Sequence, residues 1–197
     1  RARVAFEAAA RFDFDKKISE DASFNFLKLN YELAFSPFNE IINSFLAFIE
    51  KYPESPNIDQ AYDYLGKAFV TSKNYREALL SMEKIKNKNQ TVYKAMQRLA
   101  FYRGMELYID LKYEEAIYFF DYSLKYGEFD RILKARAHYW RGESNYRLGR
   151  FEMAQNDYQQ FVNSPGAQSM GEYSTAQYNM GYVFFNTKNY ERAIEWF

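Results

Sequence analysis

The sequence contains no cysteine and only one histidine among its 197 residues. Without cysteine the chain can form no disulfide, no thiolate metal site and no cysteine nucleophile. Its 26 Lys and Arg residues balance 26 Asp and Glu residues, so no global charge draws it toward nucleic acid or an anionic membrane. No apolar run approaches the roughly 20 residues that a membrane-spanning helix needs. We therefore expect no nucleic-acid partner and no direct membrane insertion by this segment.

Large apolar side chains are abundant instead. Hydrophobic residues make up 48% of the chain and aromatic residues 20%, including 19 Tyr and 19 Phe. This composition is too apolar for a disordered chain, and the length suffices for one sizeable domain or one repeat array. Because the chain starts and stops inside helical patterns, we expect it to be a segment of a longer protein.

Apolar residues recur at helical spacing along the whole chain, which predicts helices throughout. Residues 1–12 are expected to form the second helix of a truncated repeat, followed by a polar turn at 13–21. Ser36 and Pro37 are expected to cap and open a later helix. Five antiparallel helix pairs are predicted: 22–35 with 38–51, 59–71 with 75–86, 92–109 with 113–125, 130–148 with 151–162, and 173–185 with 190–197.

The five pairs share one residue pattern. Each second helix opens with an aromatic residue, at positions Phe38, Tyr75, Tyr113, Phe151 and Tyr190. A small residue follows three places later, as Ala78, Ala116, Ala154 and Ala193, and a bulky one four places after that, as Met82, Phe120, Tyr158 and Phe197. A glycine precedes the last four aromatics by nine residues, at Gly66, Gly104, Gly142 and Gly181. Glycine in a helix costs about 1 kcal/mol relative to alanine, so this fixed phase indicates close helix packing.

This pattern resembles the tetratricopeptide repeat, whose helix pairs carry Gly, an aromatic, Ala and an aromatic at these relative positions. The resemblance implies an all-α fold, a right-handed superhelical solenoid of antiparallel helix pairs. It also implies a single array over residues 1–197, with repeats at about 22–55, 59–90, 92–127, 130–163 and 173–197, the last one truncated. The segment Phe48 to Ser55 further resembles repeats of bacterial cell-envelope proteins, which favours a periplasmic or outer-membrane-associated location over the cytoplasm.

Several positions depart from the family pattern. Leu29 stands where glycine would fall, Ile41 replaces alanine, and Asn145 replaces an expected aromatic residue. Arg103 and Arg141 occupy equivalent positions just before glycine, where leucine is usual. We expect both arginines to form partly buried salt bridges to acids on following helices, such as Glu115 or Asp121 for Arg103.

The first helices of successive tetratricopeptide repeats line a concave groove. Carrying these positions onto the third to fifth pairs yields a groove of aromatic residues and interspersed arginine, a composition enriched in interaction hot spots. Roughly half of the tyrosines are expected to pack against neighbouring helices instead. The predicted partner-binding groove consists of Arg98, Phe101, Met105, Tyr108, Arg136, Tyr139, Glu143, Tyr146, Arg147, Tyr178, Tyr182 and Phe185.

These features predict a non-catalytic scaffold that binds a protein or peptide segment in the groove. The alternative is a structural component of a larger bacterial envelope or outer-membrane assembly, which would use convex or edge surfaces. His138 is expected to be packed or hydrogen-bonded, and the sequence has no metal-ligand spacing, phosphate loop or nucleophile motif. We therefore predict no enzyme activity, no metal and no cofactor. A carboxylate clamp is not expected, because the corresponding positions hold Asp63 with Lys67 and Phe101 with Met105.

Overall fold

A computed structural model describes residues 1–12, 15–33, 38–85 and 88–197, without the side chains of residues 38 and 39. Every regular element in these ranges is helical, so the predicted all-α fold is confirmed. The helices are α1 (Ala2–Arg11), α2 (Lys16–Glu32), α3 (Phe38–Lys51), α4 (Ile58–Ser72), α5 (Tyr75–Glu83), α6 (Gln90–Ile109), α7 (Tyr113–Lys125), α8 (Arg131–Arg147), α9 (Phe151–Val162), the short 3-10 helix η1 (Ala167–Ser169), α10 (Tyr173–Asn186) and α11 (Tyr190–Trp196).

Helix α2 begins six residues earlier than the sequence pattern predicted. The Asp15 side chain caps it by accepting hydrogen bonds from the backbone N–H groups of Lys17 at 2.9 Å and Ile18 at 3.2 Å. The Ser19 hydroxyl is buried and donates to the Ala10 carbonyl at 3.0 Å, which joins α2 to α1. The polar run looked like a turn because it lacks an apolar stripe, but the cap decides its conformation. The predicted cap at Ser36 and Pro37 lies outside the described residues.

The chain divides into two compact units, residues 1–95 and 96–197, with the boundary inside α6. The core of the first unit contains aromatic rings from α2, α3 and α4. The rings of Phe45 and Tyr64 stack with centroids 5.7 Å apart, and the Phe24 ring contacts Phe48 at 5.8 Å. The Tyr64 hydroxyl donates to Glu32 at 2.7 Å. Burial, together with this carboxylate, raises the pKa of Tyr64 to about 12.

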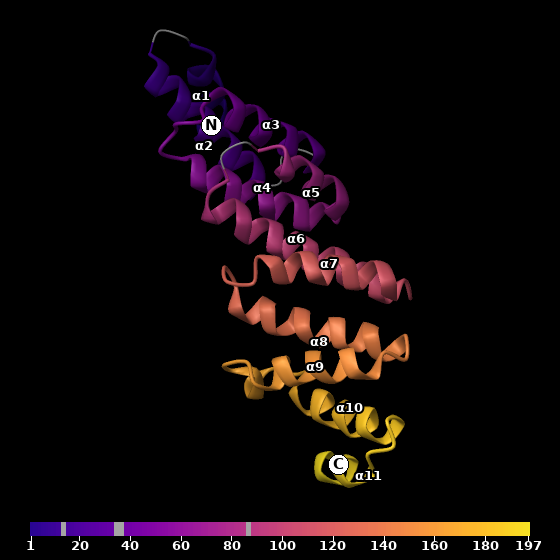
Figure 1. The fold of residues 1–197 in the computed structure, drawn as a ribbon. Helices are drawn as coiled ribbons and strands as arrows, with labels where there is room; N and C mark the ends of the chain where they lie inside the picture. The colour runs from indigo at the N-terminus through magenta and orange to yellow at the C-terminus, as the bar shows by residue number, and fades with distance from the viewer. Residues whose placement is uncertain (13–14, 34–37, 86–87) are drawn as a thin grey trace. The chain divides into compact units, whose positions relative to one another are not determined.

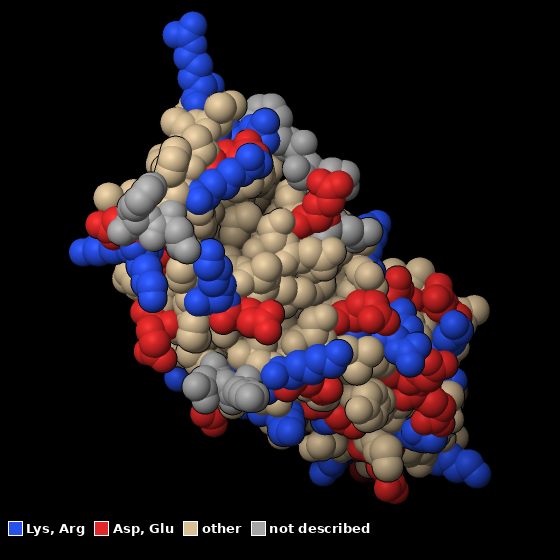
Figure 2. Space-filling view, turned by 90° about the horizontal axis from the view of Figure 1, so that it is seen from above, with Lys and Arg blue, Asp and Glu red and all other residues tan. Residues whose placement is uncertain are grey.

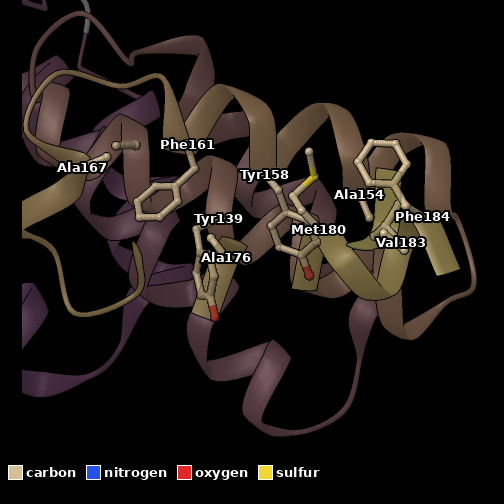
Figure 3. Close-up of a cluster of buried hydrophobic side chains, with 11 residues drawn as sticks. Tyr139, Ala154, Tyr158, Phe161, Ala167, Ala176, Met180, Val183 and Phe184 are labelled. Carbon is tan, nitrogen blue, oxygen red and sulfur yellow. The ribbon is translucent and has the colours of Figure 1, made fainter. Parts of the chain in front are cut away.

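The second unit contains the pairs α8–α9 and α10–α11, with α7 packed against α8 (Figure 1). One hydrophobic cluster joins α8 to α11 and includes Tyr139, Tyr158, Phe161 and Met180 (Figure 3). A second cluster joins α6, α7 and α8. Consecutive helices therefore share cores, as expected when each helix pair cannot bury its apolar surface alone.

Each helical glycine of the second unit receives a bulky side chain from the following helix or, in the case of Phe197, from the residue directly after that helix. The contact occurs three times, between Gly104 and Phe120, Gly142 and Tyr158, and Gly181 and Phe197. A Cβ atom added at Gly104 would lie only 2.7 Å from Cε1 of Phe120. This distance is far below an ordinary contact, so only glycine admits the ring. The close helix packing predicted from the glycine phase is thus present here.

The turns inside four helix pairs share a left-handed residue. The positive φ angles are 55° at Lys73, 62° at Leu111, 72° at Gly149 and 62° at Lys188. At the second of these turns, the Lys112 N–H donates to the Leu107 carbonyl at 2.9 Å, a bond that closes the helix end. Glycine suits such a backbone conformation best, because its missing Cβ removes the steric conflict. Leu111 is therefore strained, and its side chain is 70% exposed.

Replacing Gly104 with alanine should lower the free energy of unfolding by about 1–2 kcal/mol. The new methyl group collides with Phe120, which costs about 2–3 kcal/mol, and the gain of about 1 kcal/mol in helix propensity offsets only part of this cost. Urea denaturation measures the difference. Gly171→Ala is the control, because its Cβ meets nothing within 4 Å and stability should change little. A Gly104→Ala protein as stable as wild type would contradict the packing argument.

Replacing Leu111 with glycine should raise the free energy of unfolding by about 0.5–1 kcal/mol, because it relieves the left-handed strain and removes little packing. The reverse change at the equivalent turn, Gly149→Ala, should destabilise by about 1 kcal/mol although its Cβ would have open space around it. Urea midpoints of both variants test the pair. Equal or lower stability of Leu111→Gly would show that the left-handed backbone at this turn carries no strain.

Candidate partner-binding face

The twelve predicted groove residues lie on α6, α8 and α10, and we call their combined surface the first-helix face. Side-chain contacts show that these three helices adjoin. The Tyr108 ring of α6 lies 5.1 Å from the Trp140 ring of α8. The Asn186 side chain of α10 donates to the Tyr146 hydroxyl of α8 at 3.4 Å. The sequence singled out Tyr108 and Tyr146 but missed the tryptophan and asparagine that hold them.

The structure separates the twelve residues by exposure. Phe101, Tyr139 and Glu143 are buried, with 5%, 5% and 6% of their surfaces exposed, so they form the layer beneath the face and cannot contact a partner directly. The half-buried residues are Arg98, Met105, Tyr108 and Tyr146. The exposed residues are Arg136, Arg147, Tyr178, Tyr182 and Phe185. Nine of the twelve thus remain at the surface.

Glu143 is the centre of a buried hydrogen-bond network. Its carboxylate accepts hydrogen bonds from the Tyr158 hydroxyl at 2.7 Å, from the Tyr108 hydroxyl at 3.3 Å and from the Asn179 side-chain amide. The donors belong to α9, α6 and α10, so one carboxylate joins four helices. A buried carboxylate needs such donors, because it has lost its hydration. Sequence reasoning placed Glu143 at the surface, where glutamate is usually found.

The tyrosines around Glu143 are held in their protonated form. Burial raises the pKa values of Tyr158, Tyr139 and Tyr108, and the negative charge of Glu143 raises them further. Ionising any of these phenols would add a second negative charge beside the carboxylate. Arg147 lies at the exposed edge of the network, where its interaction with the Tyr108 phenol raises the pKa of the guanidinium.

A second buried polar cluster surrounds Asp157 of α9, which is 2% exposed. Arg141 of α8 donates to it through Nε at 2.9 Å and through Nη2 at 2.5 Å. Asn145 donates at 3.2 Å, and His138 Nδ1 lies 3.2 Å from the same carboxylate. Burial opposes the charge of Arg141, but the hydrogen bonds to Asp157 outweigh it and raise the guanidinium pKa. The two departures from the repeat pattern in α8 are therefore partners of one buried acid.

In the structure, Arg103 does not pair with Glu115 or Asp121, the partners that the sequence predicted. Arg103 pairs with Glu106, one turn further along the same helix, and its guanidinium carbon lies 5.8 Å above the Phe119 ring. Asp121 instead pairs with Arg141, so this arginine bridges acids from both neighbouring helices. The expectation for Arg103 was wrong because an acid on its own helix lies within easier reach of the guanidinium.

Helix α10 carries the most exposed aromatic part of the first-helix face. Tyr178, Tyr182 and Phe185 follow one another at helical spacing and are 52%, 37% and 53% exposed. The Tyr178 and Tyr182 rings meet edge to face at 4.9 Å, with their hydroxyls 3.0 Å apart. The Phe197 ring contacts both tyrosines, and Tyr190 contacts Phe185. This row combines apolar ring surface with hydroxyl groups able to hydrogen-bond a partner.

Within the described ranges, no group of three or more His, Asp or Glu side chains could hold a metal ion. No helix in the described part of the chain combines the length and the apolar composition that crossing a membrane requires. The first-helix face itself offers hydroxyl groups, aromatic rings and charged side chains.

Replacing Tyr158 with phenylalanine should lower the free energy of unfolding at pH 7 by about 1.5–3 kcal/mol, because the buried Oε1 atom of Glu143 loses one of its two donors and keeps only Asn179. The phenol pKa is raised in the folded state above its ordinary value of 10.0. Its contribution is thus complete below about pH 10 and falls as pH rises further, because the unfolded chain loses the proton first.

The difference between wild type and Tyr158→Phe should therefore shrink above pH 10 in urea denaturation measured from pH 7 to 11. Tyr118→Phe is the matched control, since Tyr118 is 62% exposed and its replacement should leave stability unchanged. A difference that grew with pH would contradict the protonated-donor assignment.

Residues 136–166 and residues 174–197 each match a family model described as Tetratricopeptide repeat. No curated protein matches the chain at significant sequence similarity. Among solved structures, the apo form of RapI is 17% identical, with a TM-score of 0.60. The match covers 98% of this chain and 56% of RapI. A crystal structure of MamA is 13% identical with a TM-score of 0.55, covering 90% of this chain and 87% of MamA.

YrrB, described as a TPR protein with an unusual peptide-binding site, is 17% identical with a TM-score of 0.51 and covers 99% of this chain and 88% of its own. At these identities the similarity concerns the fold alone. It agrees with the helix pairs, the glycine contacts and the left-handed turns described above. Residues 136–166 and 174–197 are therefore similar to tetratricopeptide repeats, and the all-α fold is similar to that of a solved tetratricopeptide-repeat protein.

Proposed function

We propose that this chain is a non-catalytic protein-interaction scaffold whose first-helix face binds a peptide or protein segment. The observation that carries the proposal is the exposed aromatic row of α10, Tyr178, Tyr182 and Phe185. Contiguous exposed aromatic surface is unusual on a protein that has no partner. Tyrosine and arginine are also enriched among the residues that dominate binding energy at interfaces.

The chemistry of the face indicates a partner with apolar anchors and some acidic character. The α10 rings offer the apolar contact area. The exposed Arg147 on α8 interacts with the Tyr108 phenol, and its guanidinium carries further N–H groups suited to carboxylates. Arg136 is partly engaged, because its Nε lies 3.3 Å from Glu172. Beneath them, the Glu143 network keeps α6, α8 and α10 together, so the face is organised before a partner arrives.

The fold similarity to YrrB supports a peptide as the class of partner, since that protein is described by its peptide-binding site. A shared fold does not specify a ligand, and the side chains of the face must do so. For this reason the proposal depends on the aromatic row and not on the fold.

The alternative function is a structural role in a larger bacterial envelope or outer-membrane assembly. Tyr118 on α7 and Met153 on α9, both on second helices of their pairs, are 62% and 60% exposed and would serve such contacts. The resemblance of Phe48 to Ser55 to envelope-protein repeats supports the same alternative. The two functions differ in which surface carries the binding energy.

Selection of a random-peptide display library on the full chain tests the proposal. Peptides selected on wild type should lose at least tenfold in affinity, about 1.4 kcal/mol, when Tyr182 and Phe185 are both replaced with alanine. Fluorescence anisotropy measures the affinity, and circular dichroism verifies that the helices persist. The matched control replaces Tyr118 and Met153 with alanine and should leave affinity unchanged. A loss in the control together with unchanged affinity in the face variant would favour the assembly role instead.

A further inference from the structure

One end of the α8–α9 pair carries an open cavity of about 560 Å³. Its walls come from the first two turns of α8, the last turn of α9 and the loop residues that flank these helices. The cavity lies within residues 96–197, and none of its lining residues belongs to the first-helix face. Sites for small molecules have volumes of roughly 300–1,000 Å³. The cavity is therefore large enough for a ligand of that kind.

The α8 wall of this cavity is positively charged. Arg131 and Lys134 line it, and neither forms an ion pair among the described residues. Of the described residues that line the cavity, only Glu128 is acidic, so the cations outnumber the acid. On the face drawn in Figure 2, by contrast, positive and negative side chains are interspersed, as expected from a net charge of zero. The local excess of positive charge favours an anionic ligand.

Two side chains of the α8 wall are held in place by the fold. The aliphatic stem of Lys134 packs against Gly127, where an added Cβ atom would lie only 2.9 Å from the lysine Cγ and Cδ atoms. The missing side chain at Gly127 thus leaves room for the stem, while Lys134 remains exposed. One turn further along α8, the His138 Nδ1 atom lies 3.2 Å from the Asp157 carboxylate. This interaction fixes the orientation of a ring that lines the cavity.

The α9 wall offers neutral hydrogen-bonding groups instead. It consists of Gln160, Asn163 and Ser164. The Gln160 side chain has no hydrogen-bond partner among the described residues. Asn163 Oδ1 accepts from Gln159 at 3.2 Å, so its amide nitrogen keeps both donors. The Ser164 hydroxyl donates to the Gln160 main-chain carbonyl at 2.8 Å, so its oxygen keeps lone pairs. This wall can both donate and accept, which suits hydroxyl groups.

We propose that this cavity binds a phosphate monoester of a polyol, with the phosphate on the α8 wall and the hydroxyl groups on the α9 wall. Arg131 supplies a guanidinium with paired N–H groups and Lys134 a compact ammonium, and both groups bind phosphate well. A phosphate ion alone would use one wall, and a neutral polyol would leave both cations unpaired. An apolar ligand would gain little, because the described lining residues include no large aliphatic side chain.

Titration of the full ¹⁵N-labelled chain with glucose 6-phosphate, followed by NMR, tests the proposal. The backbone amide signals of Lys134 and Asn163 should shift saturably, and glucose and inorganic phosphate should each bind at least tenfold more weakly. Lys134→Met should weaken glucose 6-phosphate binding at least tenfold at an unchanged Tm, because it keeps the stem against Gly127 and removes the charge. Gln160→Leu should weaken glucose 6-phosphate binding and leave the affinity for inorganic phosphate unchanged.

Two control variants show whether the binding is specific to this cavity. Lys112→Met removes the same charge from an exposed lysine at the other end of α7 and should keep the affinity for glucose 6-phosphate. Tyr182→Ala with Phe185→Ala should also keep it, so the cavity is tested independently of the first-helix face.

Four results would overturn the proposal. The first is the absence of saturable shifts, and the second is wild-type affinity in Lys134→Met. The third is equal affinity for glucose 6-phosphate and either glucose or inorganic phosphate. The fourth is tighter binding of a short phosphoserine peptide than of glucose 6-phosphate, because the phosphate would then belong to a protein partner.

Discussion

The second unit depends on the close approach of paired helices at a glycine. In each of three contacts, the bulky residue of a second helix occupies the space that a Cβ atom would need. The contact fixes the phase of both helices, because a rotation of either would bring a side chain into the gap. The rotation of each first helix then determines which of its residues are buried and which remain at the surface. Glu143 directly follows Gly142 and is consequently turned toward the meeting point of four helices.

Two departures from the repeat pattern in α8 are explained by one buried acid in the second unit. Arg141 and Asn145 each replace an apolar residue, and either change alone would bury an unpaired polar group. Together with His138 they surround the carboxylate of Asp157. Each of these buried polar groups thus has a partner in one connected cluster. Such a cluster is strongly dependent on geometry, since hydrogen bonds tolerate less displacement than apolar contacts. It therefore ties α8 to α9 in a single register.

The first-helix face combines an ordered foundation with an exposed surface. Its exposed aromatic rings lie above the hydrogen-bond network of Glu143, so a partner would find a surface that is already ordered. Such a surface would gain affinity from buried apolar area, because little side-chain entropy remains to be lost on binding.

The sequence by itself determined the all-α fold, most helix bounds and the positions of close helix contact, because these depend on local periodicity and on glycine and proline chemistry. It also singled out the aromatic residues of α10. Only the tertiary structure decided that Phe101, Tyr139 and Glu143 are buried, and that Arg141 and not Arg103 bridges two helices. The spacing of residues in the sequence determines which of them lie on the same face of a helix. Burial and pairing depend on which side chains the neighbouring helices bring to that face, and one sequence pattern does not contain that information.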